Sequence, residues 1–334
     1  MNQRAKRQKP ASPRQGSRPV RASSHVLPVE KPSVSLLWSG AAAGLFMLFL
    51  TALPSPLPVV NPAIYQRTAE ARWNQMIGTI AGGIDSYHGD VGVYLKDLKT
   101  GRVYEHLADH SFVSASLIKL PIMVAVFQAI RDGRLALHTR IRYHRRDRRS
   151  GSGRLKFARA GGYFPVSFLV YKMMTLSDNT ATAMLIQQLG YDYLNDVFMK
   201  VGLTETRINP TGMSLASRVN PLYDNYTTPR EMGLLLEKIY RHELVSDGFS
   251  DMMLDIMKSV NSHNRLARNL PPSWQLAHKT GLLRKNCHDV GIVFTPEGDN
   301  YILCVLTGEN HNYRMAKHMI ERLGQLAYEY MGNS

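Results

Sequence analysis

The longest hydrophobic stretch of the chain runs from residue 34 to residue 53 and contains 20 residues without a charged side chain. At a rise of about 1.5 Å per residue, a helix of this length spans roughly 30 Å, the thickness of a bilayer's hydrocarbon core. The stretch has no amphipathic period and is longer than the apolar core of a typical signal peptide. The pattern predicts an uncleaved transmembrane anchor.

Polar segments flank this predicted anchor on both sides. Residues 1–33 carry eight basic side chains and one glutamate, and their composition is typical of a disordered segment. The positive-inside rule keeps such a tail in the cytoplasm. Residues 54–62 are rich in proline and predict a stiff, extended linker. The remainder, residues 63–334, is therefore expected to be an extracytoplasmic domain of a single-pass protein of the cell membrane.

Beyond the linker, the hydrophobic periods predict strands near both ends of the domain and helices between and around them. The expected strands are 91–95, 103–106, 275–279, 289–295 and 301–307. The expected helices are 63–87, 116–130, 166–177, 180–189, 191–201, 229–241, 250–260 and 313–330. This order predicts an α/β protein of the α+β type: one antiparallel sheet flanked by helices, with an all-helical subdomain and a site in the cleft between them.

The formal charge of +15 is concentrated in two segments, the tail and residues 140–160. The second segment has nine basic side chains and one aspartate, whereas the rest of the chain is balanced, with 24 basic and 24 acidic residues. No zinc-finger, basic-zipper or RNA-recognition motif accompanies the charge, so no nucleic-acid partner is expected. The segment is either a solvated loop or a surface that contacts acidic wall polymers or lipid head groups.

The first candidate for chemistry is Ser116-Leu-Ile-Lys119, at the start of a predicted helix. A spacing of three residues brings the hydroxyl and the amine onto one face of the helix. A lysine desolvated beside an apolar helix can have its pKa lowered enough to take the serine's proton. The pattern alone also fits a capping serine and a surface lysine.

Two further motifs follow at wide spacings. Ser177-Asp-Asn179 begins 61 residues after Ser116, between two predicted helices, where its hydroxyl can relay a proton and its amide can hold an acyl amide. Lys279-Thr280-Gly281 begins 102 residues later on a predicted strand, where the cation and the hydroxyl can bind a carboxylate. Each motif alone fits an ordinary cap or turn, but the three in this order are far less common.

With these motifs, residues 61–331 resemble the penicillin-recognising serine hydrolases, and most closely the class A β-lactamases. The resemblance implies that Ser116 is acylated and that Lys119 accepts its proton. It implies that Ser177 protonates the leaving amine and that Asn179, Lys279, Thr280 and Gly281 bind the substrate. The backbone N–H groups of Ser116 and Leu282 are the implied oxyanion hole. The implied substrate is a β-lactam or a D-alanyl peptide, and no metal or cofactor is implied.

The chain departs from the class A pattern at the deacylating glutamate. If Arg207 matches the arginine near the start of that loop, the glutamate's place is taken by Asn209, which cannot accept a proton. Glu205 and Asp224 are the nearby acids that are candidates to replace it. A D-alanyl-D-alanine peptidase inhibited by β-lactams, and a non-enzymatic sensor of β-lactams or wall peptides, therefore remain as alternatives. The oligomeric state cannot be predicted.

Overall fold

A computed structural model of the protein describes residues 62–210 and 224–332. The predicted tail, the predicted anchor and almost all of the predicted linker lie outside these residues, so they remain predictions. Within the described ranges, none of the helices combines the length and the hydrophobicity that a membrane span needs.

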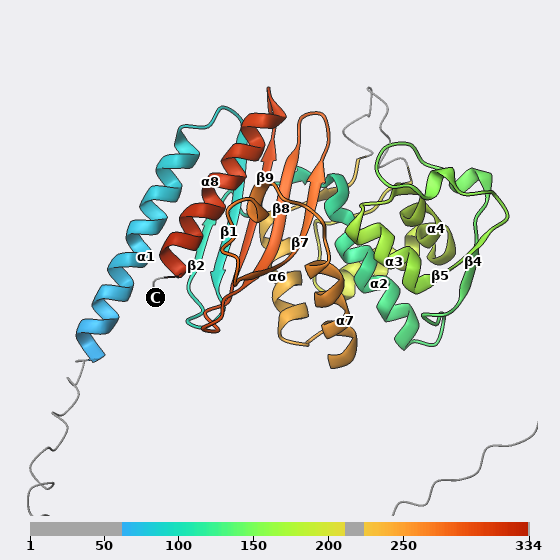
Figure 1. Ribbon diagram of the computed structural model, residues 1–334, viewed down its shortest axis with the longest axis horizontal. Coiled ribbons are helices and arrows are strands. Elements are labelled where there is room, and N and C mark those ends of the chain that lie inside the picture. Colours follow the sequence, from blue (N-terminus) through green and yellow to red (C-terminus); the bar gives the residue numbers. More distant parts are fainter. Residues whose placement is uncertain (1–61, 211–223, 333–334) are drawn as a thin grey trace, which may run out of the picture. The chain divides into compact units, whose positions relative to one another are not determined.

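An antiparallel sheet of five strands, in the order β2-β1-β9-β8-β7, forms the centre of the folded unit (Figure 1). The strands are β1 (Asp90–Asp97), β2 (Val103–His106), β7 (Gln275–Leu282), β8 (Cys287–Phe294) and β9 (Tyr301–Gly308). Strand β1 pairs along its whole length with β9, so the two ends of the domain meet in the middle of the sheet. Every residue of β9 is buried, as expected for a strand whose sheet is covered on both faces.

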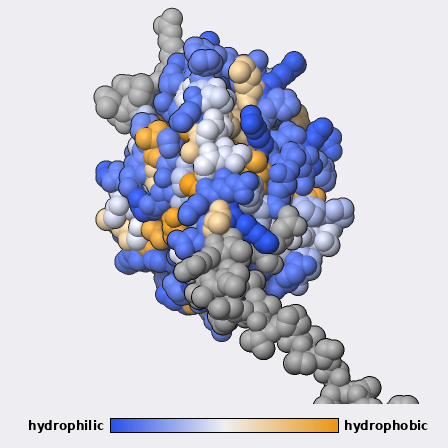
Figure 2. Space-filling model, turned by 90° about the vertical axis from the view of Figure 1, so that its left-hand side faces the viewer, coloured by the Kyte–Doolittle hydropathy of each residue, from blue (hydrophilic) through white to orange (hydrophobic). Residues whose placement is uncertain are grey.

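Helices α1 (Pro62–Asp85) and α8 (Tyr313–Met331) cover one face of the sheet. Their core residues pack with those of β1 and β9, and the cluster includes Ile80, Leu303 and Ile320. The outer surface on this side is mostly hydrophilic, with scattered hydrophobic groups (Figure 2). The α1–α8 layer is therefore an amphipathic cover for the sheet.

Helices α6 (Pro229–Tyr240) and α7 (Asp247–Lys258) pack on the opposite face of the sheet, next to an all-helical subdomain. The subdomain contains α2 (Lys119–Arg131), α3 (Val166–Thr175), α4 (Asn179–Leu189) and α5 (Tyr191–Lys200). Helix α2 lies at its centre, and ten of its thirteen residues are buried. A helix that is apolar on all sides is stable only inside a core.

The predicted α+β architecture is confirmed, and the main helices and strands lie within a few residues of their predicted positions. Short elements escaped prediction. Two small antiparallel pairs join β3 (Phe112–Val113) to β6 (Tyr226–Thr227) and β4 (Arg140–Arg142) to β5 (Tyr163–Pro165). Strands of two or three residues are too short for a period of two to be recognised.

Candidate active site

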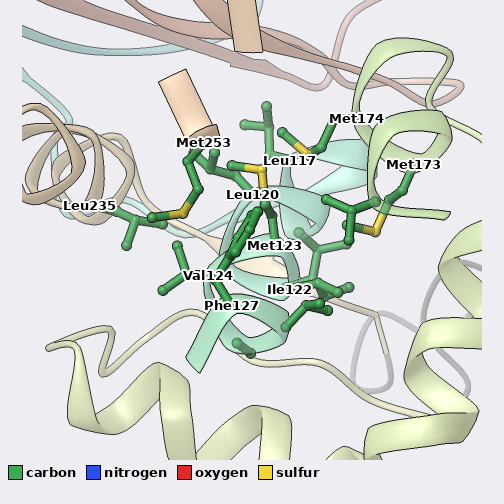
Figure 3. Close-up of a cluster of buried hydrophobic side chains, with 14 of the residues drawn as sticks. Leu117, Leu120, Ile122, Met123, Val124, Phe127, Met173, Met174, Leu235 and Met253 are labelled. Carbon is green, nitrogen blue, oxygen red and sulfur yellow. The ribbon is translucent and has the colours of Figure 1, made fainter. Parts of the chain in front are cut away.

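Ser116 lies in a 3₁₀ turn, Ala115–Ile118, which leads directly into α2. The prediction that the α-helix begins at Ser116 is therefore wrong by three residues. The α-helix begins at Lys119, and Ser116 lies in the turn before it. Figure 3 shows how this region is held: Leu117 and Leu120 project into the same buried cluster as Met174 and Met253. Because these side chains fill the core, the turn that carries the hydroxyl is fixed against the centre of the subdomain.

The amine of Lys119 makes four close contacts at the base of the site. Its Nζ lies 2.6 Å from the Ser177 carbonyl oxygen and 2.7 Å from Asn179 Oδ1. The hydroxyl oxygens of Ser177 and Ser116 lie 3.0 Å and 3.2 Å away. The two shortest contacts are to oxygens that only accept hydrogen bonds, whereas the two longer ones are to hydroxyls that can also donate.

Burial changes the protonation of this amine. The Lys119 side chain has no exposed surface. Desolvation, together with the nearby charge of Lys279, lowers the pKa of Lys119 well below its ordinary value, and Asp178 opposes the shift. A neutral amine has two hydrogens for the two carbonyl-type acceptors and one lone pair for a serine hydroxyl. The geometry thus suits a base that takes a proton from Ser116.

The segment Ser177-Asp178-Asn179 is positioned by the start of α4. Buried Asp178 is the N-cap residue and accepts hydrogen bonds from the backbone N–H groups of Thr180 and Ala181. Ser177 has a left-handed backbone, with φ of 51°, which is uncommon for a residue with a side chain. The predicted helix 166–177 consequently ends early, at Thr175, and Ser177 turns toward Lys119.

Lys279, Thr280 and Gly281 lie on the edge strand β7. Lys279 Nζ donates to Ser177 Oγ, at 3.3 Å, and to the Thr280 carbonyl, at 2.9 Å. Desolvation lowers the pKa of Lys279 to about 7, an effect that Asp289 opposes and that Arg265 reinforces. The site thus holds two buried lysines, both with weakened affinity for protons.

Gly281 is required by close packing between β7 and the turn that carries the serine. A Cβ atom at this position would lie 2.9 Å from a ring carbon of His288 and 3.3 Å from Ala115 Cβ. Such contacts are closer than van der Waals separation allows. A side chain at position 281 would push β7 away from Ser116.

These residues surround a pocket of about 340 Å³ that reaches from the serine to the loop after α7. Its lining includes Ser116, Ser177, Lys279, Thr280 and Leu282, so the structure brings residues of all three motifs together. The other lining residues are Ser152, Thr175, Leu176, Val260, Asn261, Ser262, Asn264 and Arg265. Lys119 and Asn179 are not among the lining residues: Lys119 contacts the hydroxyls of Ser116 and Ser177, and Asn179 contacts Lys119.

Arg265 is a pocket residue that the motif analysis missed. Its side chain is only 5% exposed, its backbone φ is +59°, and its buried Nε has no hydrogen-bond partner among the described residues. Arg265 and Lys279 line the same pocket, and the charge of Arg265 adds to the lowering of the pKa of that lysine. The two cations suit a carboxylate. The only sequence signal is a polar stretch, residues 261–265, between a predicted helix and a predicted strand.

Asn209 lies on the loop that follows α5 and is not one of the residues that line the pocket. Its side-chain amide donates to the Asp224 carbonyl and its backbone N–H donates to Asn225 Oδ1, both at 2.8 Å. Glu205 is exposed, and its backbone N–H is held by buried Glu231. Among the described residues that line the pocket, neither Asn209 nor the two predicted candidates to replace the glutamate, Glu205 and Asp224, occurs.

The part of the chain that the structure describes contains no cluster of side chains that could bind a metal ion. No group of three or more His, Cys, Asp or Glu side chains suited to a metal ion occurs there.

Comparison with known proteins agrees with this fold and site. The family model of the Beta-lactamase enzyme family matches residues 75–331. A β-lactamase of Streptomyces lavendulae is 28% identical over 225 residues, which are 65% of this chain and 73% of that protein. The crystal structure of a β-lactamase from Sphaerobacter thermophilus is 26% identical, covers 78% of this chain and 98% of that one, and has a TM-score of 0.71.

A second structural neighbour carries a bound penicillin. It is a point mutant of PBP-A, solved as an acyl-enzyme complex with penicillin G. It is 27% identical, covers 79% of this chain and 97% of that one, and has a TM-score of 0.72. The fold and the serine–lysine site thus define a serine hydrolase of the class A β-lactamase type. The chain belongs to the β-lactamase enzyme family.

Proposed function

We propose that the protein forms an acyl-enzyme at Ser116 with β-lactam amides. The observation that carries the proposal is the contact of Ser116 Oγ with the buried amine of Lys119, 3.2 Å away. The neutral lysine takes the hydroxyl proton while Ser116 Oγ bonds to the carbonyl carbon of the substrate. The backbone N–H groups of Ser116 and Leu282, two residues of one pocket, are proposed to stabilise the oxyanion.

The second half of acylation needs a proton on the leaving nitrogen. Ser177 Oγ lies between the two lysines, 3.0 Å from Lys119 Nζ and 3.3 Å from Lys279 Nζ. We assign it the relay: its hydroxyl proton passes to the nitrogen as the C–N bond breaks, and the proton held by Lys119 replaces it. Asn179 is assigned to the substrate's acyl amide through its side chain, whose Oδ1 also orients Lys119.

The carboxylate of the substrate is assigned to the cationic end of the pocket. Lys279, Thr280 and Arg265 provide two positive groups and one hydroxyl there. A bound carboxylate favours the protonated form of Lys279 and therefore offsets the desolvation that lowers its pKa.

Deacylation is expected to be slow. An asparagine amide has no basic group with which to activate water, and that of Asn209 is already bonded to the Asp224 carbonyl. This feature favours a second candidate function, a D-alanyl-D-alanine peptidase that β-lactams inhibit, and the similarity to PBP-A is compatible with it. Both candidates share the acylation step.

We further propose that the catalytic domain, residues 63–334, is extracytoplasmic and is tethered by a membrane helix. Support comes from the uncharged run 34–53, with its basic flank on one side and its proline-rich flank on the other. A protease-accessibility assay on intact cells and on inverted vesicles tests this topology. Digestion of the domain only in inverted vesicles would refute it.

The test of the chemical proposal uses the full-length chain in a non-ionic detergent. The protein is mixed with a penicillin, and the intact protein mass and the released product are followed over time, with Ser116→Ala as the control. An adduct that forms at Ser116 and persists supports slow deacylation and favours the peptidase or the sensor. An adduct that clears with many turnovers identifies a working β-lactamase and contradicts the predicted slow step. Absence of an adduct on the wild-type protein refutes the acyl-enzyme proposal.

A further inference from the structure

The basic segment 140–160 is a folded surface with a strong excess of positive charge. Its only acidic residue, Asp147, is 3% exposed and accepts a hydrogen bond from the backbone N–H of His144, at 2.7 Å. That carboxylate therefore serves the backbone and does not cover the neighbouring guanidinium groups. Eight arginines of the segment are exposed: Arg140, Arg142, Arg145, Arg146, Arg148, Arg149, Arg154 and Arg159.

These guanidinium groups lack acidic partners within the described part of the chain. Among residues 62–210 and 224–332, no ion pair involves any of the eight arginines. Arg149 instead donates to the carbonyl oxygens of Arg146 and Arg148, its own neighbours. Like charges gathered this way repel one another, so a mobile or bound anion is needed to offset their field.

The segment is attached to the active site through backbone contacts. The carbonyl of Ser150 accepts from Asn179 Nδ2, at 2.9 Å, and the carbonyl of Ser152 accepts from the Asn179 N–H, at 3.1 Å. Ser152 also lines the pocket. The arginine surface and the mouth of the pocket are therefore parts of one continuous rim.

Gly153 allows the backbone of the segment to lie close to Asp178, because glycine has no Cβ atom. A Cβ atom there would lie 2.1 Å from the carboxyl carbon of Asp178, which also accepts from the Leu155 N–H at 2.8 Å. The segment is thus pressed against the residue that caps α4 and positions Ser177. An anion bound to the arginines is held at a fixed place relative to the reacting serine.

The position of the surface favours a partner that also reaches the pocket. Figure 1 shows β4 and β5 at the end of the folded unit opposite α1. The arginines therefore lie at the other end of the folded unit from the helix that begins it, and next to the pocket that Ser152 lines. A chain-like polyanion can lie along the rim and present a branch to the pocket.

We propose that the exposed arginines of residues 140–160 bind an anionic polymer, one with repeated phosphate or carboxylate groups, whose amide-bearing branches are the substrates of the Ser116 site. This inference rests on the proposed function and names its substrate class. The arginines hold the polymer by charge, and the pocket selects the amide.

The test measures polymer binding to the full-length chain in a non-ionic detergent. Fluorescein-labelled polyphosphate and poly-L-glutamate are the probes, followed by anisotropy at several salt concentrations, and the two probes separate a phosphate from a carboxylate preference. Arg145→Gln, Arg146→Gln and Arg148→Gln are combined in one variant. Its affinity for the preferred polymer is expected to fall about tenfold or more at low salt, because three charged contacts are lost.

A matched variant removes the same charge elsewhere. Lys200→Gln, Arg314→Gln and Arg322→Gln change three exposed residues of α5 and α8, and a loss below about twofold is expected. Equal losses in the two variants, or no binding of either polymer at low salt, overturn the proposal. Stronger arginine-dependent binding to phosphatidylglycerol vesicles than to either polymer also overturns it, and assigns the surface to a lipid bilayer.

Acylation by a small penicillin is measured on the same samples. Both triple variants are expected to react within about twofold of the wild type, since the arginines do not touch the reacting atoms. Normal acylation without polymer binding refutes only this inference. Polymer binding without acylation of the wild type refutes the acyl-enzyme proposal and, with it, the substrate class inferred here.

Discussion

Two groups of positive side chains lie on either side of Asn179, and they differ in almost every physical respect. Lys119 and Lys279 are buried, and desolvation lowers the pKa of both. The arginines of residues 140–160 are exposed and keep their charge, because a guanidinium stays protonated in proteins. The same formal charge therefore suits proton transfer in one place and long-range attraction in the other.

The largest expected effect comes from removing the buried base. Lys119→Met keeps the length of the side chain but leaves no proton acceptor, so acylation by penicillin is expected to slow by about 10³-fold or more. The rate is measured with a fluorescent penicillin. Lys172→Met, which changes a lysine of α3 outside the pocket lining, is the control. A Lys119→Met rate within about tenfold of the wild type contradicts the assigned role.

The second-largest effect is expected from disrupting the contact between Gly153, in the arginine-rich segment, and Asp178, beside the active site. Gly153→Ala places a Cβ against Asp178 and strains a residue with φ of +94°, so the free energy of unfolding is expected to fall by about 2–4 kcal/mol. Gly161→Ala has similar strain, with φ of +92°, but open space around the new Cβ. Its expected loss is about 1 kcal/mol. Denaturant unfolding compares the two, and equal losses contradict a tight junction.

A change of pH is expected to have a smaller effect, on the affinity for penicillin. Lys279 is charged below its pKa of about 7 and neutral above it, so it attracts a carboxylate less as pH rises through that value. The non-covalent affinity for penicillin, from the saturation of the acylation rate, is expected to weaken by about three- to tenfold across this range. Lys279→Arg stays charged and should remove the dependence. An unchanged pH profile in this variant assigns the titration to another group.

The smallest effect concerns stability at the exposed surface. The combined Arg145→Gln, Arg146→Gln and Arg148→Gln variant is expected to change the free energy of unfolding by less than about 0.5 kcal/mol, since no described ion pair is lost. Lys96→Met, which removes a partly buried ion pair with Glu237 at 2.7 Å, is expected to cost more. Denaturant unfolding again provides the measurement. A larger loss in the arginine variant would mean that the segment is held by contacts of those side chains.

The sequence predicted the periodic parts of this molecule well. Strand 103–106 was placed without error, and the helix predicted from residue 229 does begin at Pro229, where the side chain of Thr228 caps it. The structure brings the three motifs together around one pocket, as their resemblance to a known family implied. The prediction that strands from both ends of the domain share one antiparallel sheet is confirmed, whereas the particular pairing of β1 with β9 was not predicted.

The parts that escaped prediction depend on backbone conformation and on contacts distant in sequence. Ala115, Ser177 and Arg265 all have left-handed backbones, with φ of 48°, 51° and 59°, and all three lie at the site. No local signal marks such residues, because their strain is stable only when the surrounding packing enforces it. Arg265, which lies in a polar stretch of the sequence, was therefore not predicted as a site residue, although it lines the same pocket as Lys279.

The pairing of β1 with β9 has a consequence for how the protein folds. Val93 lies opposite Val305, a partner more than 200 residues away along the chain. Closing so long a loop is slow, and folding rates fall as contacts become less local. The sheet cannot close until β9 is available, since β7 pairs with β8 and β8 pairs with β9. We therefore expect the reactive centre to be one of the last parts of the molecule to become complete during folding.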